Sequence, residues 1–315
     1  MRGPTVSDGA LGVVVMAYGT PASPDDIEGY YTHIRRGRPP EPEQLADLAR
    51  RYAALGGTST LAERTAAQVT AIAATLEDRN PGRFLVELGQ KHAAPFVEDA
   101  AATLLSEGID RAVGLVLAPH YSAASVGTYQ SRLREAMEAG GGTHVAIDHW
   151  ADEAAWLAFS ATAVTDALSD LPAATKVLFT AHSLPERALV GDPYPTQLAQ
   201  SARAIADRAG LAPWAGWGLA WQSAGRTPEP WRGPDVLQVI RDLAETGRSD
   251  GVLVCPQGFT TDHLEVGFDL DIEARGVADE LGLAFARTQT VDDDPAVMAA
   301  LADRVVVAAS ALSVA

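Results

Sequence analysis

Short runs of apolar and β-branched residues alternate with helix-length, alanine-rich segments along the whole 315-residue chain. The sequence predicts strands at residues 11–18, 84–89, 112–118, 145–148, 177–181, 216–221, 251–256 and 283–287. It predicts helices at residues 60–76, 96–107, 123–139, 153–169, 194–209, 234–245 and 295–312. Strands that alternate with helices of this length indicate βαβ units and a parallel sheet. The strands lack polar alternation, which is typical of a sheet covered on both faces.

Polar residues follow the strands in both halves of the chain, and this weak internal repeat indicates two domains. The first half has them at 18, 90–92 and 119–120, and the second at 182–183, 222–223 and 257. We therefore predict an α/β fold of two doubly wound, Rossmann-like domains. The first comprises residues 1–155 and a returning C-terminal helix at 290–315, and the second comprises residues 156–289. Ligands of such folds bind beyond the carboxyl ends of the strands.

Composition and missing motifs exclude several classes of function. The formal net charge of −17 argues against nucleic acid as a partner, because phosphate binding needs a basic face. Cys255 is the single cysteine, so this chain alone forms no disulfide and no cysteine-ligated cluster. The sequence has no P-loop, no dinucleotide-binding glycine motif after a strand and no run of about 18 apolar residues. We expect a cytoplasmic protein without a membrane partner.

Two segments contain residues that are difficult to explain as scaffold. His182 stands at the end of a strand, just before a turn at Pro185. A lone histidine there is often structural. In the second segment, an α-helix would place Glu265, Asp269 and Glu273 on one face, at i, i+4 and i+8. They form either a solvated acidic stripe or a ladder of hard oxygen ligands for a divalent cation.

Six sequence blocks, in order from about residue 11 to residue 310, resemble the ferrochelatase family. They are Ala-Tyr-Gly-Thr-Pro (17–21), Tyr-Tyr-Thr-His-Ile-Arg-Arg-Gly (30–37), Leu-Ala-Pro-His-Tyr-Ser (117–122), Ala-His-Ser-Leu-Pro (181–185), Trp-Gln-Ser (221–223) with Thr-Pro-Glu-Pro-Trp (227–231), and Asp-His-Leu-Glu (262–265). The resemblance implies the chelatase fold, with a porphyrin cleft between its two domains.

The same resemblance assigns roles to the residues of the two segments. His182 matches the family's active-site histidine, and Glu265 matches its partner glutamate. Asp269 and Glu273 match acidic residues that lead away from that site, so all four are expected to contact the metal. Whether His182 accepts a pyrrole proton or is the last ligand of the metal stays open at this point.

The resemblance also implies residues that bind the porphyrin. Tyr18 matches the opposite wall of the cleft, where it can become an axial ligand of the inserted iron. The positions that hold porphyrin carboxylates in the soluble bacterial branch are matched by Arg35, Arg36, Ser59 and Tyr129. Coproporphyrin has four propionates where protoporphyrin has two, and arginines favour the more highly charged ligand.

We therefore expect a lyase of haem biosynthesis that inserts Fe²⁺ into coproporphyrin III and yields coprohaem. Iron is a substrate, and we expect no cofactor and no iron–sulfur cluster. We expect a monomer that contacts neighbouring haem-pathway enzymes at most transiently. Three alternatives remain: a protoporphyrin IX ferrochelatase, a non-catalytic porphyrin or haem carrier, and a cobalt chelatase of corrinoid synthesis.

Overall fold

The computed structural model describes residues 9–213 and 215–313, and it contains two parallel four-stranded sheets. The first sheet has the order β2-β1-β3-β4 and consists of β1 (Leu11–Ala17), β2 (Phe84–Gln90), β3 (Arg111–Val116) and β4 (Thr143–Ile147). The second has the order β6-β5-β7-β8 and consists of β5 (Thr175–His182), β6 (Trp217–Gln222), β7 (Gly251–Cys255) and β8 (Ala284–Arg287). The predicted α/β fold with two doubly wound sheets is confirmed.

The chain separates into two compact units, each built around one sheet. Unit 1 comprises the chain up to residue 118, residues 123–150 and the chain from residue 292 onwards. Unit 2 comprises residues 119–122 and 151–291. The two sheets have the same strand order, so β5 is the counterpart of β1 and β6 the counterpart of β2.

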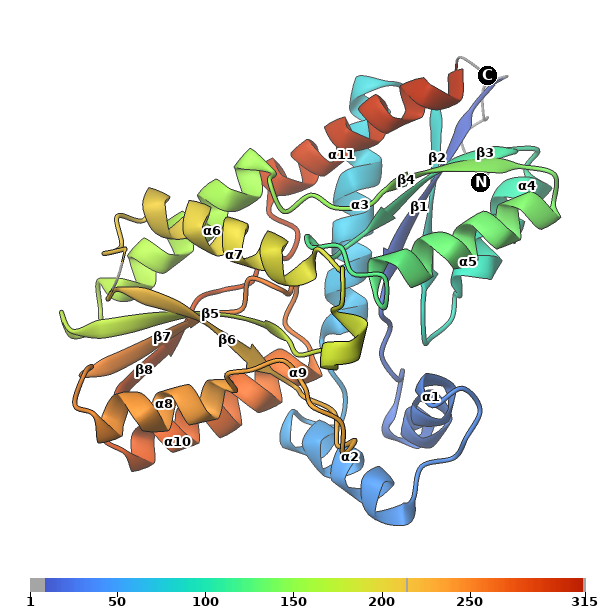
Figure 1. Cartoon of the computed structure of the whole chain (residues 1–315). Helices are drawn as coiled ribbons and strands as arrows, with labels where there is room; N and C mark the ends of the chain where they lie inside the picture. Colours follow the sequence, from blue (N-terminus) through green and yellow to red (C-terminus); the bar gives the residue numbers. More distant parts are fainter. Residues whose placement is uncertain (1–8, 214, 314–315) are drawn as a thin grey trace. The chain divides into compact units, whose positions relative to one another are not determined.

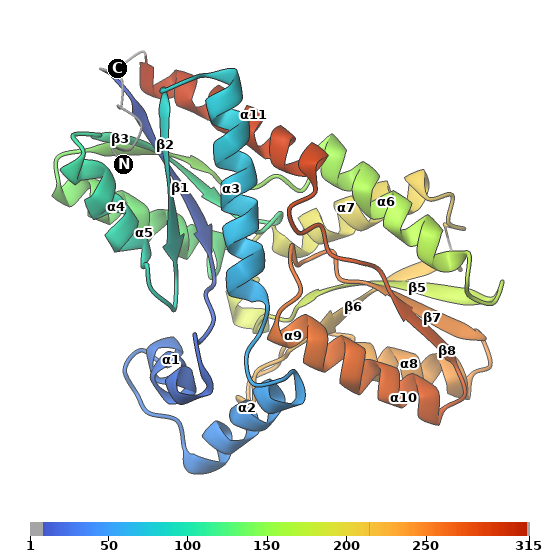
Figure 2. The same cartoon turned by 180° about the vertical axis from the view of Figure 1, so that it is seen from behind.

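In unit 1, helices cover both faces of the sheet (Figure 1 and Figure 2). One face is covered by α3 (Leu61–Arg79) and α11 (Pro295–Ser310), and the other by α4 (Val97–Ser106) and α5 (Val126–Ala139). All seven residues of β1 are buried, as a central strand between two helical layers requires. The sequence did not predict α1 (Ile27–Ile34) and α2 (Pro42–Ala54), which lie beyond the carboxyl end of β1.

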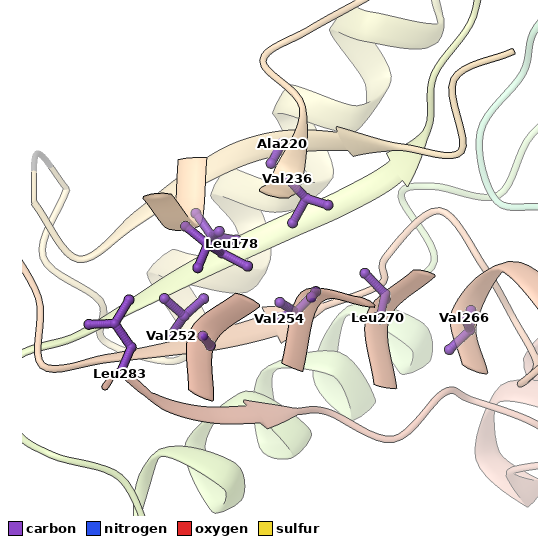
Figure 3. Packing of buried hydrophobic residues seen from close by; sticks show 11 residues of the cluster. Leu178, Ala220, Val236, Val252, Val254, Val266, Leu270 and Leu283 are labelled. Atoms are coloured by element: carbon purple, nitrogen blue, oxygen red, sulfur yellow. The ribbon is translucent and has the colours of Figure 1, made fainter. Parts of the chain in front are cut away.

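Unit 2 has the same layered arrangement. One face of its sheet is covered by α6 (Ala154–Leu168) and α7 (Tyr194–Arg208), and the other by α8 (Val236–Glu245) and the segment from residue 264 to residue 280. On that second face, Leu178, Val252 and Val254 of the strands meet Val236 of α8 and Leu270 in a buried apolar cluster (Figure 3).

The acidic segment is helical, but its winding differs from the expected α-helix. A single turn, α9 (Leu264–Val266), leads into the π-helical segment η3 (Gly267–Ala274), and α10 (Arg275–Glu280) follows. The segment is helical, but the α-helical winding assumed for the i, i+4, i+8 spacing is wrong from Gly267 to Ala274. Hydrogen bonds from i to i+5 make wider turns than those of an α-helix.

The reason lies in an apolar stripe that repeats every fourth residue. In an α-helix, four residues make about 40° more than a full turn, so each member of such a stripe would be rotated about 40° around the helix axis from the one before. The later members would then point away from the sheet. The wider π-helical turns rotate in the opposite sense, so all four residues of the stripe are fully buried: Val266, Leu270, Ala274 and Ala278. Three acidic residues each precede a member of this stripe by one position: Glu265, Asp269 and Glu273.

Candidate active site

His182 is the last residue of β5, a strand paired with β6 on one side and β7 on the other. Its Nδ1 hydrogen-bonds the carbonyl oxygen of Ser183. A carbonyl oxygen only accepts, so Nδ1 carries the hydrogen, and Nε2 is the ring atom available to a proton or a metal. The hydroxyl of Tyr194 donates to the carbonyl of His182 over 3.3 Å and fixes the end of the strand.

The carboxylate of Glu265 lies between two histidine rings. His182 Nε2 is 3.4 Å from Glu265 Oε1, and His263 Nε2 is 3.7 Å from Glu265 Oε2. His263 Nδ1 donates to the carbonyl of Thr261 over 3.2 Å, so it presents its Nε2 in the same manner. The structure thus brings together the predicted pair, His182 and Glu265, and adds His263.

The two members of the pair shift each other's pKa in opposite directions. Burial lowers the pKa of His182, but the Glu265 carboxylate more than offsets this effect, and the pKa rises to about 9. Burial raises the pKa of Glu265, and the imidazoles of His182 and His263 outweigh it and hold that pKa well below the ordinary value. Without metal, the resting pair is an imidazolium facing a carboxylate.

Two polar residues at the end of β6 hold this arrangement in place. Gln222 lies opposite His182 in the sheet register, and its Nε2 donates to the backbone carbonyl of Glu265 over 3.1 Å. Ser223 has a φ of +59°, a left-handed conformation that is uncommon outside glycine, and its hydroxyl donates to the carboxylate of Asp269. Neither role is predicted from the sequence, although Gln222 and Ser223 stand where a strand neighbouring that of His182 ends.

The acidic residues beyond Glu265 do not complete a metal centre. Asp269 is 6% exposed, and Glu273 is half-buried on the last turn of η3. Within residues 9–213 and 215–313, no three His, Cys, Asp or Glu side chains converge in a way that could hold a metal ion.

In unit 1, Tyr18 directly follows β1, and its ring lies against His92, one of two histidines that contact each other. The ring is 43% exposed and lies against His92, with centroids 4.7 Å apart. His92 Nδ1 is 3.0 Å from His33 Nδ1, so one imidazole donates and the other accepts. The ring of His33 in turn stacks on Phe96, with centroids 5.2 Å apart.

Cations surround this histidine pair. Burial and the neighbouring charges of Lys91, His33 and Arg132 lower the pKa of His92 to about 3. Burial, Arg132 and Arg36 lower the pKa of Lys91 to about 8. His92 is therefore neutral near pH 7, and Arg132 is itself paired with the Glu98 carboxylate over 2.6 Å.

The four predicted carboxylate-binding residues also belong to unit 1. Arg35 lies over the ring of Tyr31, 5.7 Å from its centroid, and Arg36 is exposed. Ser59 Oγ is 3.4 Å from Thr20 Oγ1 and accepts from the backbone N–H of Leu61. Tyr129 is 3% exposed, its pKa is raised by burial, and the ammonium group of Lys91 lies 5.0 Å from its ring centroid. Lys91, which is not among the residues predicted from the sequence, thus covers the ring of Tyr129.

Arg36 has a strained backbone. Its φ is +57°, and the N–H groups of Arg36 and Gly37 bond the carbonyls of His33 and Thr32. This is a Schellman end to α1, with arginine at the left-handed position where glycine is usual. A non-glycine residue there costs about 1–2 kcal/mol.

These features fall within one family. Comparison with protein families matches residues 10–309 to the ferrochelatase family, and the chain belongs to it. It is 45% identical over 298 residues to the coproporphyrin III ferrochelatase of Geobacillus kaustophilus (strain HTA426), covering 92% of this chain and 93% of that protein. It is 42% identical over 299 residues to the coproporphyrin III ferrochelatase of Bacillus subtilis (strain 168), covering 93% and 96%.

Solved structures support the same fold at low sequence identity. The sirohydrochlorin chelatase SirB of Bacillus subtilis subspecies spizizenii, solved with cobalt, superposes with a TM-score of 0.55 at 11% identity, covering 96% of each chain. CbiX, the terminal enzyme of sirohaem biosynthesis in denitrifying bacteria, superposes with a TM-score of 0.51 at 16% identity. The match covers 95% of this chain and 99% of that one. In the described part of the chain, no helix is long and apolar enough to cross a membrane.

Proposed function

We propose that this protein inserts Fe²⁺ into coproporphyrin III and releases coprohaem and two protons. The proposal rests on one observation above all: a chain of the ferrochelatase family holds His182 Nε2 3.4 Å from Glu265 at the end of a central strand. Relatives that are 42–45% identical over more than nine tenths of this chain are named coproporphyrin III ferrochelatases.

The pair supplies the proton chemistry that insertion needs. Each porphyrin gives up two pyrrole N–H protons, and a positioned imidazole with a carboxylate partner is a suitable acceptor and relay. Because Nδ1 is bonded to the Ser183 carbonyl, Nε2 is the atom that gives up its proton to Glu265, which passes it to water. The neutral Nε2 then either takes the pyrrole proton or contacts Fe²⁺. Glu265 receives the proton that His182 gives up, and Asp269 and Glu273 attract the hydrated cation. Tyr18 is the proposed axial ligand of the inserted iron.

The cations of unit 1 favour the more anionic porphyrin. Arg35 and Arg36 offer guanidinium groups to propionates, and Lys91 and Arg132 add positive charge near Tyr18. Coproporphyrin presents four propionates to this surface and protoporphyrin only two. We therefore propose coproporphyrin III as the preferred substrate, with Ser59 and Tyr129 as further carboxylate contacts.

We also propose that no resident cofactor takes part. Cys255, the single cysteine, is buried on β7, and burial raises the pKa of its thiol to about 12. A thiol in this state is a poor metal ligand, because metals bind the thiolate.

The decisive test is anaerobic incubation with Fe²⁺ and each porphyrin in detergent-free buffer, followed by absorbance. We expect kcat/KM to be higher for coproporphyrin III than for protoporphyrin IX. The reverse order would assign protoporphyrin IX instead. Tight binding of both porphyrins without insertion of iron would mean a carrier. Stoichiometric inorganic sulfide in the fresh protein would contradict the absence of a cluster.

A further inference from the structure

Arg287, the last residue of β8, makes a bridge that no role described above explains. Its Nε and Nη2 donate to the two carboxylate oxygens of Asp271 over 2.8 and 2.9 Å. Its Nη1 and Nη2 donate to the two carboxylate oxygens of Asp262 over 3.0 and 3.3 Å. Nη1 also donates to the carbonyl of Thr288 over 3.0 Å. All five N–H groups of the guanidinium are thus used.

This bridge is shielded from water and geometrically specific. The Arg287 side chain is 13% exposed, and those of Asp262 and Asp271 are 29% and 33% exposed. Thr290 adds a hydrogen bond to Asp262 over 3.1 Å. Paired, parallel N–H···O bonds fix both the distance and the orientation of the two groups. A lysine at this position would supply the charge without the fork.

The two carboxylates flank Glu265 along the chain. Asp262 comes three residues before Glu265, in the loop that enters α9, and Asp271 comes six residues after it, within η3. One guanidinium on an edge strand therefore fixes both ends of the stretch that carries His263, Glu265 and Asp269. The apolar stripe holds the other side of this stretch against the sheet.

We infer that Arg287 is a positioning residue for metal insertion, because it fixes the backbone on both sides of Glu265 and so sets the distance between Glu265 and His182. This inference rests on the proposed function. It also assigns Asp262 and Asp271 to the scaffold, although they belong to the same acidic segment as the proposed metal contacts. Partners that orient a metal ligand typically change metal affinity or activity by about 10–100-fold when they are removed.

The test uses Zn²⁺ as a probe of the metal- and porphyrin-free protein, measured by titration calorimetry. Binding heat that is present in the wild type and absent in His182→Ala is assigned to Zn²⁺ at the His182–Glu265 pair. We expect Arg287→Gln and Asp271→Asn to weaken this binding about 10–100-fold, and Arg287→Lys to fall between them and the wild type. In the insertion assay, KM for Fe²⁺ should rise in the same order, while affinity for coproporphyrin stays within about twofold.

Arg275→Gln is the matched control. Arg275 also joins the helical segment to β8, through its guanidinium over the Phe285 ring at 5.0 Å and a bond to the Phe285 carbonyl at 3.4 Å. This variant should leave both constants unchanged. Circular dichroism melts identify variants that fail to fold. If Arg287→Gln does not fold, Asp271→Asn serves as the test instead, because it keeps the hydrogen bonds between Arg287 and Asp262.

Each outcome decides the inference. Unchanged Zn²⁺ affinity in a folded Arg287→Gln protein would overturn it, and so would an equal loss in Arg275→Gln. If no Zn²⁺ binding depends on His182, the inference is also wrong. If the wild type binds Zn²⁺ at His182 but inserts no iron, the proposed function fails, and the Zn²⁺ affinities still decide the role of Arg287.

Discussion

The two units have sheets of the same strand order, yet a histidine near a strand end has its pKa lowered in unit 1 and raised in unit 2. In unit 1, His92 follows β2 among cations, and its pKa falls to about 3. In unit 2, His182 ends β5 beside a carboxylate, and its pKa rises to about 9. Strand topology therefore places a polar residue at an edge of the sheet, and neighbouring charges decide what it can do. In unit 1 the neighbouring charges help to keep a histidine neutral, and in unit 2 they keep one protonated.

The largest expected effect is on the rate of metal insertion, and it should be seen when His182 is replaced but not when His92 is replaced. His182→Ala should lower kcat/KM for Fe²⁺ insertion by about 10²–10⁴-fold, because a positioned acid–base group is lost, while coproporphyrin still binds. His92→Ala is the matched control from unit 1, and it should lower porphyrin affinity without raising KM for Fe²⁺. Insertion rates measure kcat/KM, and quenching of porphyrin fluorescence measures porphyrin affinity. Near-normal turnover of His182→Ala would refute the assigned chemistry.

The second prediction concerns the opposite pH dependence of the two histidines in metal-free protein. The stability that protonated His182 gains from Glu265 is fully present below pH of about 6.5 and is lost as the pH rises through about 9. His92 is neutral in the fold, so its contribution is lost as the pH falls from about 6.5 towards 3. Glu265→Gln should bring the pKa of His182 below its ordinary value, since burial is then opposed only weakly.

Ring-proton NMR titrations and melts at several pH values check this prediction. Parallel pH dependence of the two histidines, or a His182 titration that Glu265→Gln leaves in place, would mean that Glu265 is not the source of the difference.

A smaller effect on KM for Fe²⁺ is expected at Glu273, which lies further along the acidic segment than Glu265. Glu273→Gln removes a half-buried charge on η3, so KM for Fe²⁺ should rise on the order of threefold to tenfold, with little change in kcat. Salt screens a partly exposed charge, so the difference should shrink at high ionic strength. A fall in kcat alone would assign Glu273 to local structure in place of attraction of the cation.

The smallest effect should appear at the strained arginine of unit 1. Arg36→Gly relieves the left-handed backbone, and the free energy of unfolding should stay equal or rise by up to about 1 kcal/mol. Loss of an exposed charge should weaken coproporphyrin binding about twofold to fivefold and protoporphyrin binding less. Denaturant melts measure the free energy of unfolding, and fluorescence titrations measure the affinity for each porphyrin. A less stable variant with unchanged binding would show that the strain serves no ligand.

The strands, the long helices and the central pair could be predicted from the sequence, and the reasons are local. Apolar runs such as that of β1 are unambiguous, and His182 and Glu265 occur in recognisable blocks. The π-helical winding was missed, although its signal, the apolar repeat at every fourth residue from Val266 to Ala278, is visible in the sequence. Helix α1 was missed because its eight residues are too few for a clear periodicity, and α2 because it is rich in charged residues and begins at a proline.

The sequence by itself determined the alternation of strands and helices, the presence of a single cysteine and the residue types of the site. Only the tertiary structure decided the charge state of each histidine, because His92 and His182 have the same ordinary pKa until their neighbours are in place. It also decided that Arg287 bridges Asp262 and Asp271, which are distant from it along the chain. Electrostatic energy depends on distance and on exclusion of water, and folding sets both.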